Sequence, residues 1–201
     1  MSETGNSIIF LNAPKGAGKD TIAAALESIF GTNKIAFKEP MFAIACAMTG
    51  MSLSAFMKTY SDRNKKENPC EEFLGMSGRD LLISISEDFC KPKFGEDYFG
   101  RMALKKMNSS HFKRTGYVFS DSGFHSEIVP IAEMYGPQNC FIVQFVGQGS
   151  ESFEGDSRDW ANAEDIGVTT IKMNRKNEGD VTPYEFAEDV VTMINYARNH
   201  K

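Results

Sequence analysis

Short apolar runs without polar alternation recur along the chain and predict buried β-strands. They are rich in Ile, Val and Phe, which is typical of parallel strands covered by helices on both faces. Five such runs stand out: Ser7–Leu11, Asn33–Phe37, Tyr117–Ser120, Cys140–Val146 and Val168–Met173. Parallel strands need long crossover connections, so helices are expected between these runs.

Helical patterns do lie between the runs. Asp20–Phe30 has apolar residues at positions 22, 26, 29 and 30, and Phe124–Tyr135 is followed by Gly-Pro. Thr182–Arg198 begins with TPYE, a capping-box sequence with proline at the first helical position. This alternation of strands and helices predicts an α/β fold with right-handed crossovers.

The interval between the second and third runs, about 38–116, is too long for one crossover helix. It contains three predicted helices, Met41–Met48, Ser77–Cys90 and Asp97–Met107, and a predicted polar loop at Asp62–Cys70. Ligands of open α/β sheets bind at the carboxyl ends of the strands. We therefore expect one domain, 1–201, whose helical insertion covers the acceptor side of a site at that edge.

Composition narrows the class of protein. The 201 residues include 41% apolar and 24% charged residues and carry a net charge of −5, which gives no global attraction to nucleic acid. The four cysteines have neither CxxC pairing nor metal-ligand spacing, so free thiols in a cytoplasmic protein are expected. The apolar run near the N-terminus is too short for a secretory signal or a membrane span. The sequence leaves the oligomeric state open, a homodimer included.

The segment NAPKGAGKDT, Asn12–Thr21, carries the strongest chemical signal. A phosphate-binding P-loop needs glycines where backbone N–H groups turn toward the anion, a lysine for the β- and γ-phosphates, and a following helix. All three are present, and they predict ATP as the ligand. The predicted ATP-binding residues of this segment are Asn12, Ala13, Lys15, Gly16, Ala17, Gly18, Lys19, Asp20 and Thr21.

Two positions of this segment depart from the usual P-loop pattern. Ala13 replaces the first glycine, and Asp20 replaces the Ser or Thr that usually contacts magnesium. A carboxylate oxygen is a good ligand for a hard cation, so Asp20 is expected to hold Mg²⁺ directly or through water.

FLNAPKGAGKDT resembles the P-loop of nucleoside-monophosphate-kinase-like proteins, and its GKDT ending is similar to that of phage deoxynucleoside monophosphate kinases. Weaker similarities follow in SGRDLLISISEDF, YVFSDSGFHSE, GDSRDW and TIKMNRKNEGD. The resemblance implies a P-loop NTPase fold with five parallel strands in the order 2-3-1-4-5. It also implies that Arg79 lies over the acceptor, that Arg158 belongs to a lid at about 147–162, and that Asn174 contacts the nucleotide base.

One departure from that family concerns the acceptor. The monophosphate kinases usually have an arginine just after the aspartate of strand three, whereas this chain has Asp121-Ser122-Gly123-Phe124. A hydroxyl acceptor must lose a proton, so Asp121 would serve as base or magnesium ligand beside a Phe124 that contacts the acceptor. A similar group of P-loop proteins phosphorylates 5-hydroxymethyluracil within phage DNA. That reaction is the preferred hypothesis. If the source is viral, the protein is expected in the host cytoplasm.

Two alternatives remain open. In a kinase of free deoxynucleoside monophosphates, Arg79, Arg101 or Arg158 would bind the acceptor phosphate. If the substrate is DNA instead, the basic segment 101–114 would contact backbone phosphates. A nucleotide-dependent ATPase or switch is a third class. A GTP-dependent switch is disfavoured, because the nearest string to its base-recognition motif is NKKE at 64–67, which lies in the insertion and ends in glutamate.

Overall fold

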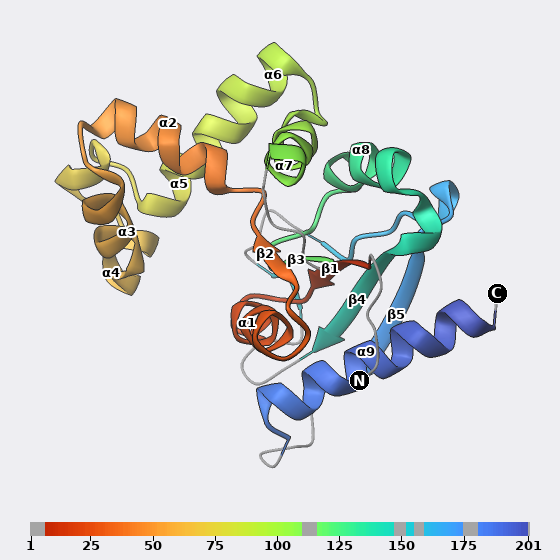
Figure 1. Cartoon of the computed structure of the whole chain (residues 1–201). Helices are drawn as coiled ribbons and strands as arrows, with labels where there is room; N and C mark the ends of the chain where they lie inside the picture. The colour runs from red at the N-terminus through yellow and green to blue at the C-terminus, as the bar shows by residue number, and fades with distance from the viewer. Residues whose placement is uncertain (1–6, 110–115, 147–151, 155–158, 175–180, 201) are drawn as a thin grey trace.

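The computed structural model describes residues 7–109, 116–146, 152–154, 159–174 and 181–200. Its centre is a five-stranded parallel sheet in the order β2-β3-β1-β4-β5 (Figure 1), which is the order implied by the sequence resemblance. The strands are β1 (Ile8–Asn12), β2 (Asn33–Ile35), β3 (Tyr117–Phe119), β4 (Cys140–Val146) and β5 (Thr169–Asn174). All five predicted strands are confirmed, with ends that move by at most two residues.

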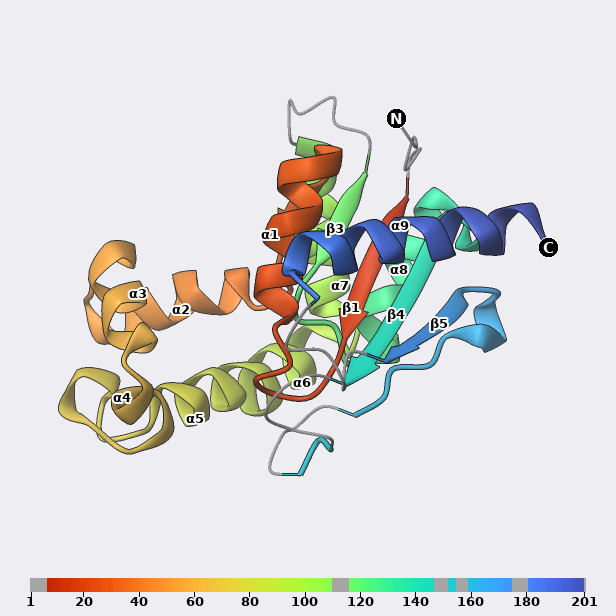
Figure 2. The same ribbon diagram turned by 90° about the horizontal axis from the view of Figure 1, so that it is seen from below.

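Helices cover both faces of the sheet, as its apolar composition predicts. On one face, α1 (Lys19–Phe30) and α9 (Pro183–Asn199) pack against Ile9, Leu11 and Val143, and Figure 2 shows both helices lying over the strands. On the other face, α7 (Tyr98–Ser109) and α8 (His125–Tyr135) cover a second core. The predicted capping box of α9 is present, since Thr182 and Glu185 exchange side-chain-to-backbone hydrogen bonds.

The insertion builds a helical lobe beside the β2 edge of the sheet (Figure 1). It contains α2 (Glu39–Thr49), α3 (Leu53–Ser61), α4 (Arg63–Glu67), a 3₁₀ turn (Glu71–Phe73) and α5 (Gly78–Ile83). The α5 helix continues as a π-helical segment (Ser84–Cys90) into α6 (Lys91–Phe94). Two further 3₁₀ turns, Pro137–Asn139 and Glu164–Ile166, precede β4 and β5.

The prediction of a polar loop at Asp62–Cys70 is wrong, because α4 lies there. The Asp62 carboxylate accepts hydrogen bonds from the backbone N–H groups of Asn64 and Lys65 and so caps the helix. The α3 helix was not predicted either; Ser52 caps it through the N–H of Ala55. The α4 helix is short and has no buried residue, so it has no apolar period that identifies it. The α3 helix does have apolar residues at helical spacing, 53, 56, 57 and 60, so its signal was present in the sequence.

The four cysteines are free thiols, as expected, and burial raises the pKa of Cys140 to about 12. No single helix within the described residues combines the length and apolar composition needed to cross a membrane. The α2–α3 pair passes that test only when the two helices are taken together, and they are bent by 105°.

Candidate active site

The P-loop joins β1 to α1 and has the backbone conformation that its glycines allow. Gly16 and Gly18 have φ angles of 84° and 88°, in the left-handed region that glycine adopts without strain. Nothing lies within 4 Å of the place where a Cβ at Gly16 would be, so it is the backbone angle that calls for glycine there. Lys19 begins α1, and its ammonium donates to the carbonyl oxygens of Ala13 and Pro14. The Lys19 side chain therefore lies across the P-loop, where it is predicted to bind the phosphates of ATP.

Asn12 anchors this loop to the neighbouring chain segments. Its buried amide group donates to the carbonyl oxygens of Ser122 and Asp159, each at 3.1 Å. Its Oδ1 accepts from the N–H of Ala161 at 3.0 Å. These bonds tie the end of β1 to the loop after β3 and to the segment before β5. The structure thus gives this predicted ATP-binding side chain a framework role.

Asp20, in the first turn of α1, is held by Lys34 of β2 and by Ser120, which directly follows β3. Its Oδ1 accepts a hydrogen bond from the Ser120 hydroxyl at 2.9 Å and pairs with the Lys34 ammonium at 2.8 Å. Burial would raise the pKa of Asp20, but Lys34, Lys38 and the Ser120 hydroxyl together lower it, so the carboxylate is ionised at neutral pH. Within the described part of the chain, no cluster of three or more metal-ligating side chains exists. Asp20 fits Mg²⁺ as one carboxylate ligand among phosphate and water oxygens, which is the usual mode for this ion.

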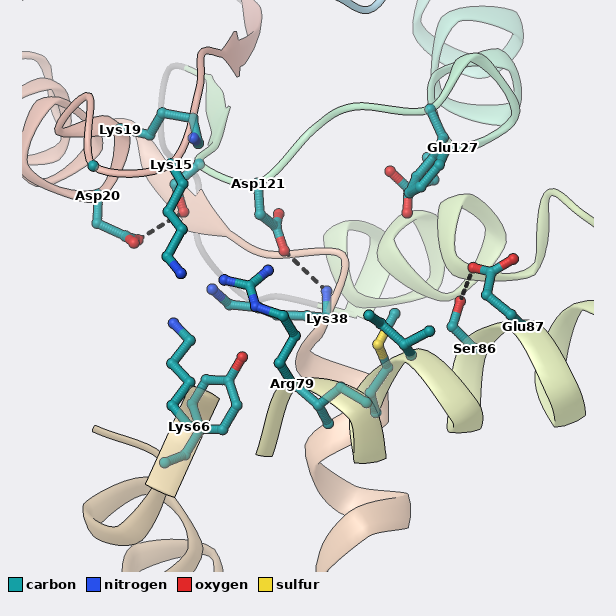
Figure 3. A pocket seen from close by; sticks show the side chains of 17 residues that line it. Lys15, Lys19, Asp20, Lys38, Lys66, Arg79, Ser86, Glu87, Asp121 and Glu127 are labelled. Carbon is teal, nitrogen blue, oxygen red and sulfur yellow. Dashed lines mark hydrogen bonds between the residues drawn. The ribbon is translucent and has the colours of Figure 1, made fainter. Parts of the chain in front are cut away.

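Asp121 lies at the end of β3 and is only 2% exposed. Its Oδ1 accepts from the N–H of Phe37 at 2.9 Å, and its Oδ2 accepts from the N–H of Lys38 at 3.1 Å, as Figure 3 shows for Lys38. It does not cap α8, which begins after Phe124 without a side-chain cap. The carboxylate therefore fixes the point where the chain leaves β2 and enters the helical lobe.

A cavity of about 200 Å³ opens between the P-loop and the helical lobe. Its cations are Lys15, Lys19, Lys38, Lys66 and Arg79, and Figure 3 shows Lys15, Lys66 and Arg79 directed into the same space. Burial lowers the pKa of the Lys66 ammonium, and the positive charges of Lys38 and Arg79 lower it further. Cations that lower one another's pKa in this way favour a bound anion.

The cavity is polarised along its length. Past the cations, Met41, Leu82 and Phe124 give it apolar walls, and Ser86, Glu87 and Glu127 line its far end. Glu127 is 2% exposed, and Figure 3 shows it and Glu87 on the side away from Lys15 and Lys66. Such a cavity suits a ligand with a negative group at one end and hydrogen-bond donors at the other.

Glu67 connects the P-loop to the helical lobe. Its Oε1 accepts from the Lys15 ammonium at 2.6 Å and from Nη2 of Arg79 at 3.2 Å, and its Oε2 accepts from Nε of Arg79 at 3.1 Å. The hydrogen bond from Arg79, aided by the one from Lys15, holds the pKa of Glu67 at about 2. The Lys15 and Arg79 nitrogens that share Oε1 lie within about 6 Å of each other, close enough for one phosphate group to contact both.

The other predicted site residues fall into three groups. Arg79 and Phe124 line the cavity, as predicted for acceptor-binding residues, and the Lys91 ammonium lies 4.2 Å from the centre of the Phe124 ring. Arg101 does not line it; its guanidinium pairs with Asp97 and donates to the carbonyl oxygen of Phe94. Asn174 ends β5 in an exposed position, and Thr21 is also exposed. Arg158 and most of the predicted lid lie outside the described residues.

Sequence reasoning missed Lys38, Lys66 and Glu67. Lys66 and Glu67 lie in the run NKKE at 64–67, within the segment expected to be a loop, and Lys38 follows the second predicted strand without any motif around it. The comparisons with known proteins add no relative, because no family model and no curated protein match the chain. The function is therefore argued from the site alone.

Proposed function

We propose that this protein is a P-loop phosphotransferase that moves the γ-phosphate of ATP to a deoxynucleotide-type acceptor. The observation that carries the proposal is the shared cavity, in which the P-loop residues Lys15 and Lys19 meet Arg79 and Lys66 of the helical lobe. Phosphoryl transfer depends mainly on positioning and charge neutralisation, and this arrangement supplies both between two substrates.

Each of these groups has a distinct role in the proposed reaction. Lys19 would neutralise charge on the β- and γ-phosphates, and Asp20 would hold Mg²⁺, which bridges phosphate oxygens when bound. Arg79 and Lys66 would hold the acceptor beside the P-loop. Asp121 supports the proposal indirectly, because it sets the position of Lys38 at the base of the lobe.

The polarised cavity favours a free deoxynucleoside monophosphate as acceptor. A phosphate between Lys15 and Arg79 would place the base near Phe124, Met41 and Leu82, with Glu127 and the Lys91-paired Glu87 at the far end of the cavity beyond it. This arrangement supplies the positive charge that the missing arginine after Asp121 would give. The acceptor hypothesis preferred from the sequence, 5-hydroxymethyluracil in DNA, retains one supporting observation: Asp121 lines the same cavity.

The basic segment proposed for DNA contact gives that alternative little help. Arg101 is paired with Asp97, and Lys106 is paired with Glu39 of α2. Residues 110–115 lie outside the described part of the chain.

The test is transfer from γ-labelled ATP to two acceptors in parallel, a panel of the four deoxynucleoside monophosphates and duplex DNA containing 5-hydroxymethyluracil. Labelled diphosphate identifies the free nucleotide as acceptor, and label in DNA identifies the hydroxymethyl group. Label recovered only as orthophosphate would place the protein among ATPases.

A further inference from the structure

Glu67 holds two of the cations that are expected to bind an acceptor phosphate, Lys15 and Arg79, and the inference drawn from it rests on the proposed function. The carboxylate contacts the P-loop through Lys15 and the helical lobe through Arg79. We infer that Glu67 is a built-in competitor for the acceptor's phosphate, and that it makes this site selective for a phosphate monoester.

The hydrogen-bond geometry supports the competition. Arg79 approaches Glu67 with Nε and Nη2, which contact different carboxylate oxygens at 3.1 and 3.2 Å. A two-pronged arrangement of this kind fits a phosphate as well as a carboxylate. Glu67 and a phosphate cannot use this guanidinium edge together, so an acceptor phosphate that binds Nε and Nη2 must displace the carboxylate.

Charge determines which ligands can displace it. A phosphate monoester carries about −1.5 to −2 at neutral pH, against −1 for the glutamate, and it offers three oxygens. The cations that would receive it, Lys15, Lys66 and Arg79, lie on the same side of the cavity (Figure 3). A backbone phosphodiester carries only one charge, and a hydroxymethyl group carries none. The exchange therefore favours a monoester over either group of a DNA substrate.

The position of Glu67 makes displacement feasible. It is the last residue of the five-residue helix α4, its side chain is 26% exposed, and Pro69 follows two residues later. The side chain can swing toward solvent without unpacking the lobe, because α4 has no buried residue.

The test is the binding of the four deoxynucleoside monophosphates, and of the matching nucleosides, to wild type and Glu67→Gln by calorimetry without ATP. Glutamine keeps the shape and removes the charge, so we expect Glu67→Gln to bind the preferred monophosphate about fivefold more tightly, equivalent to about 1 kcal/mol. Nucleoside affinity should stay within about twofold, because nucleosides lack the competing group. Glu67→Asp, which keeps the charge, should show less gain than Glu67→Gln.

Glu72→Gln is the matched control. Glu72 lies five residues further along the chain and pairs with Lys65 outside the cavity, so its loss should leave monophosphate binding unchanged. Three results would overturn the inference. The first is monophosphate affinity that is unchanged or weaker in Glu67→Gln, and the second is an equal gain in affinity for nucleosides. The third is that neither wild type nor Glu67→Gln binds any of the monophosphates. A tighter Glu67→Gln in a protein that transfers no phosphate would uphold the anion site and reject the kinase. Phosphate transfer by a protein whose monophosphate affinity does not change in Glu67→Gln would uphold the kinase and reject the role of Glu67 as a competitor.

Discussion

Replacing Asp121 separates a positioning role from a role in proton transfer. In Asp121→Asn, one side-chain oxygen remains to accept, and the new NH₂ group faces the second backbone N–H instead of bonding to it. Hydrogen bonds to charged groups contribute about 1.5–3 kcal/mol each. Losing one of the two bonds to Phe37 and Lys38 and weakening the other should therefore destabilise the protein by about 2–4 kcal/mol.

Urea denaturation at neutral pH measures this loss, with transfer activity followed under conditions in which the variant is fully folded. Asp165→Asn is the control, because that exposed carboxylate pairs only at the surface with His125 and should cost less than about 1 kcal/mol. The reasoning is refuted if Asp121→Asn unfolds within about 1 kcal/mol of wild type yet has lost transfer. That result would place Asp121 in the chemistry, as the hydroxyl-acceptor hypothesis requires.

Three further predictions concern the P-loop, the cation cluster and the α7–α8 contact. Lys19→Ala should reduce single-turnover transfer by at least about a hundredfold, since it removes a cation from the transferring phosphate; near-wild-type turnover would argue against the P-loop assignment. Because Glu67 has a pKa of about 2 instead of 4.5, its ion pairs stabilise the fold above about pH 4.5 and lose that effect as the pH falls toward 2. The unfolding free energy of wild type should exceed that of Glu67→Gln by about 1 kcal/mol at neutral pH and by less than half of that near about pH 3. A difference that stays constant with pH would contradict this. Gly100→Ala should destabilise by about 1–3 kcal/mol in urea, because its Cβ would lie 2.4 Å from the Glu127 carbonyl oxygen; an unchanged midpoint would show that α7 and α8 can separate.

The sheet was predictable because its strands are buried on both faces. Runs such as Cys140–Val146 have no reason to alternate with polar residues, so apolar content alone marks them, and here the predicted bounds match the observed strand. The capping box of α9 was readable for a similar reason, since it depends on four consecutive residues.

The site was predictable only in part, because much of it depends on contacts between distant segments. The P-loop is a local motif, and Gly16, Gly18 and Lys19 form the loop and helix start that the sequence predicts. The Glu67–Arg79 pair depends on how α4 and α5 pack, and the bonds from Asp121 to two backbone amides depend on β2 lying beside β3. Neither relation leaves a spacing pattern in the sequence.

The most direct test of the central claim is the fate of the γ-phosphate in a single turnover, with protein in excess over labelled ATP. Each deoxynucleoside monophosphate, and duplex DNA containing 5-hydroxymethyluracil, is present in turn. The account predicts that label appears in the diphosphate of at least one nucleotide, and that Lys19→Ala prepared in the same way gives none. Label that stays in ATP or appears only as orthophosphate with every acceptor, DNA included, would contradict it.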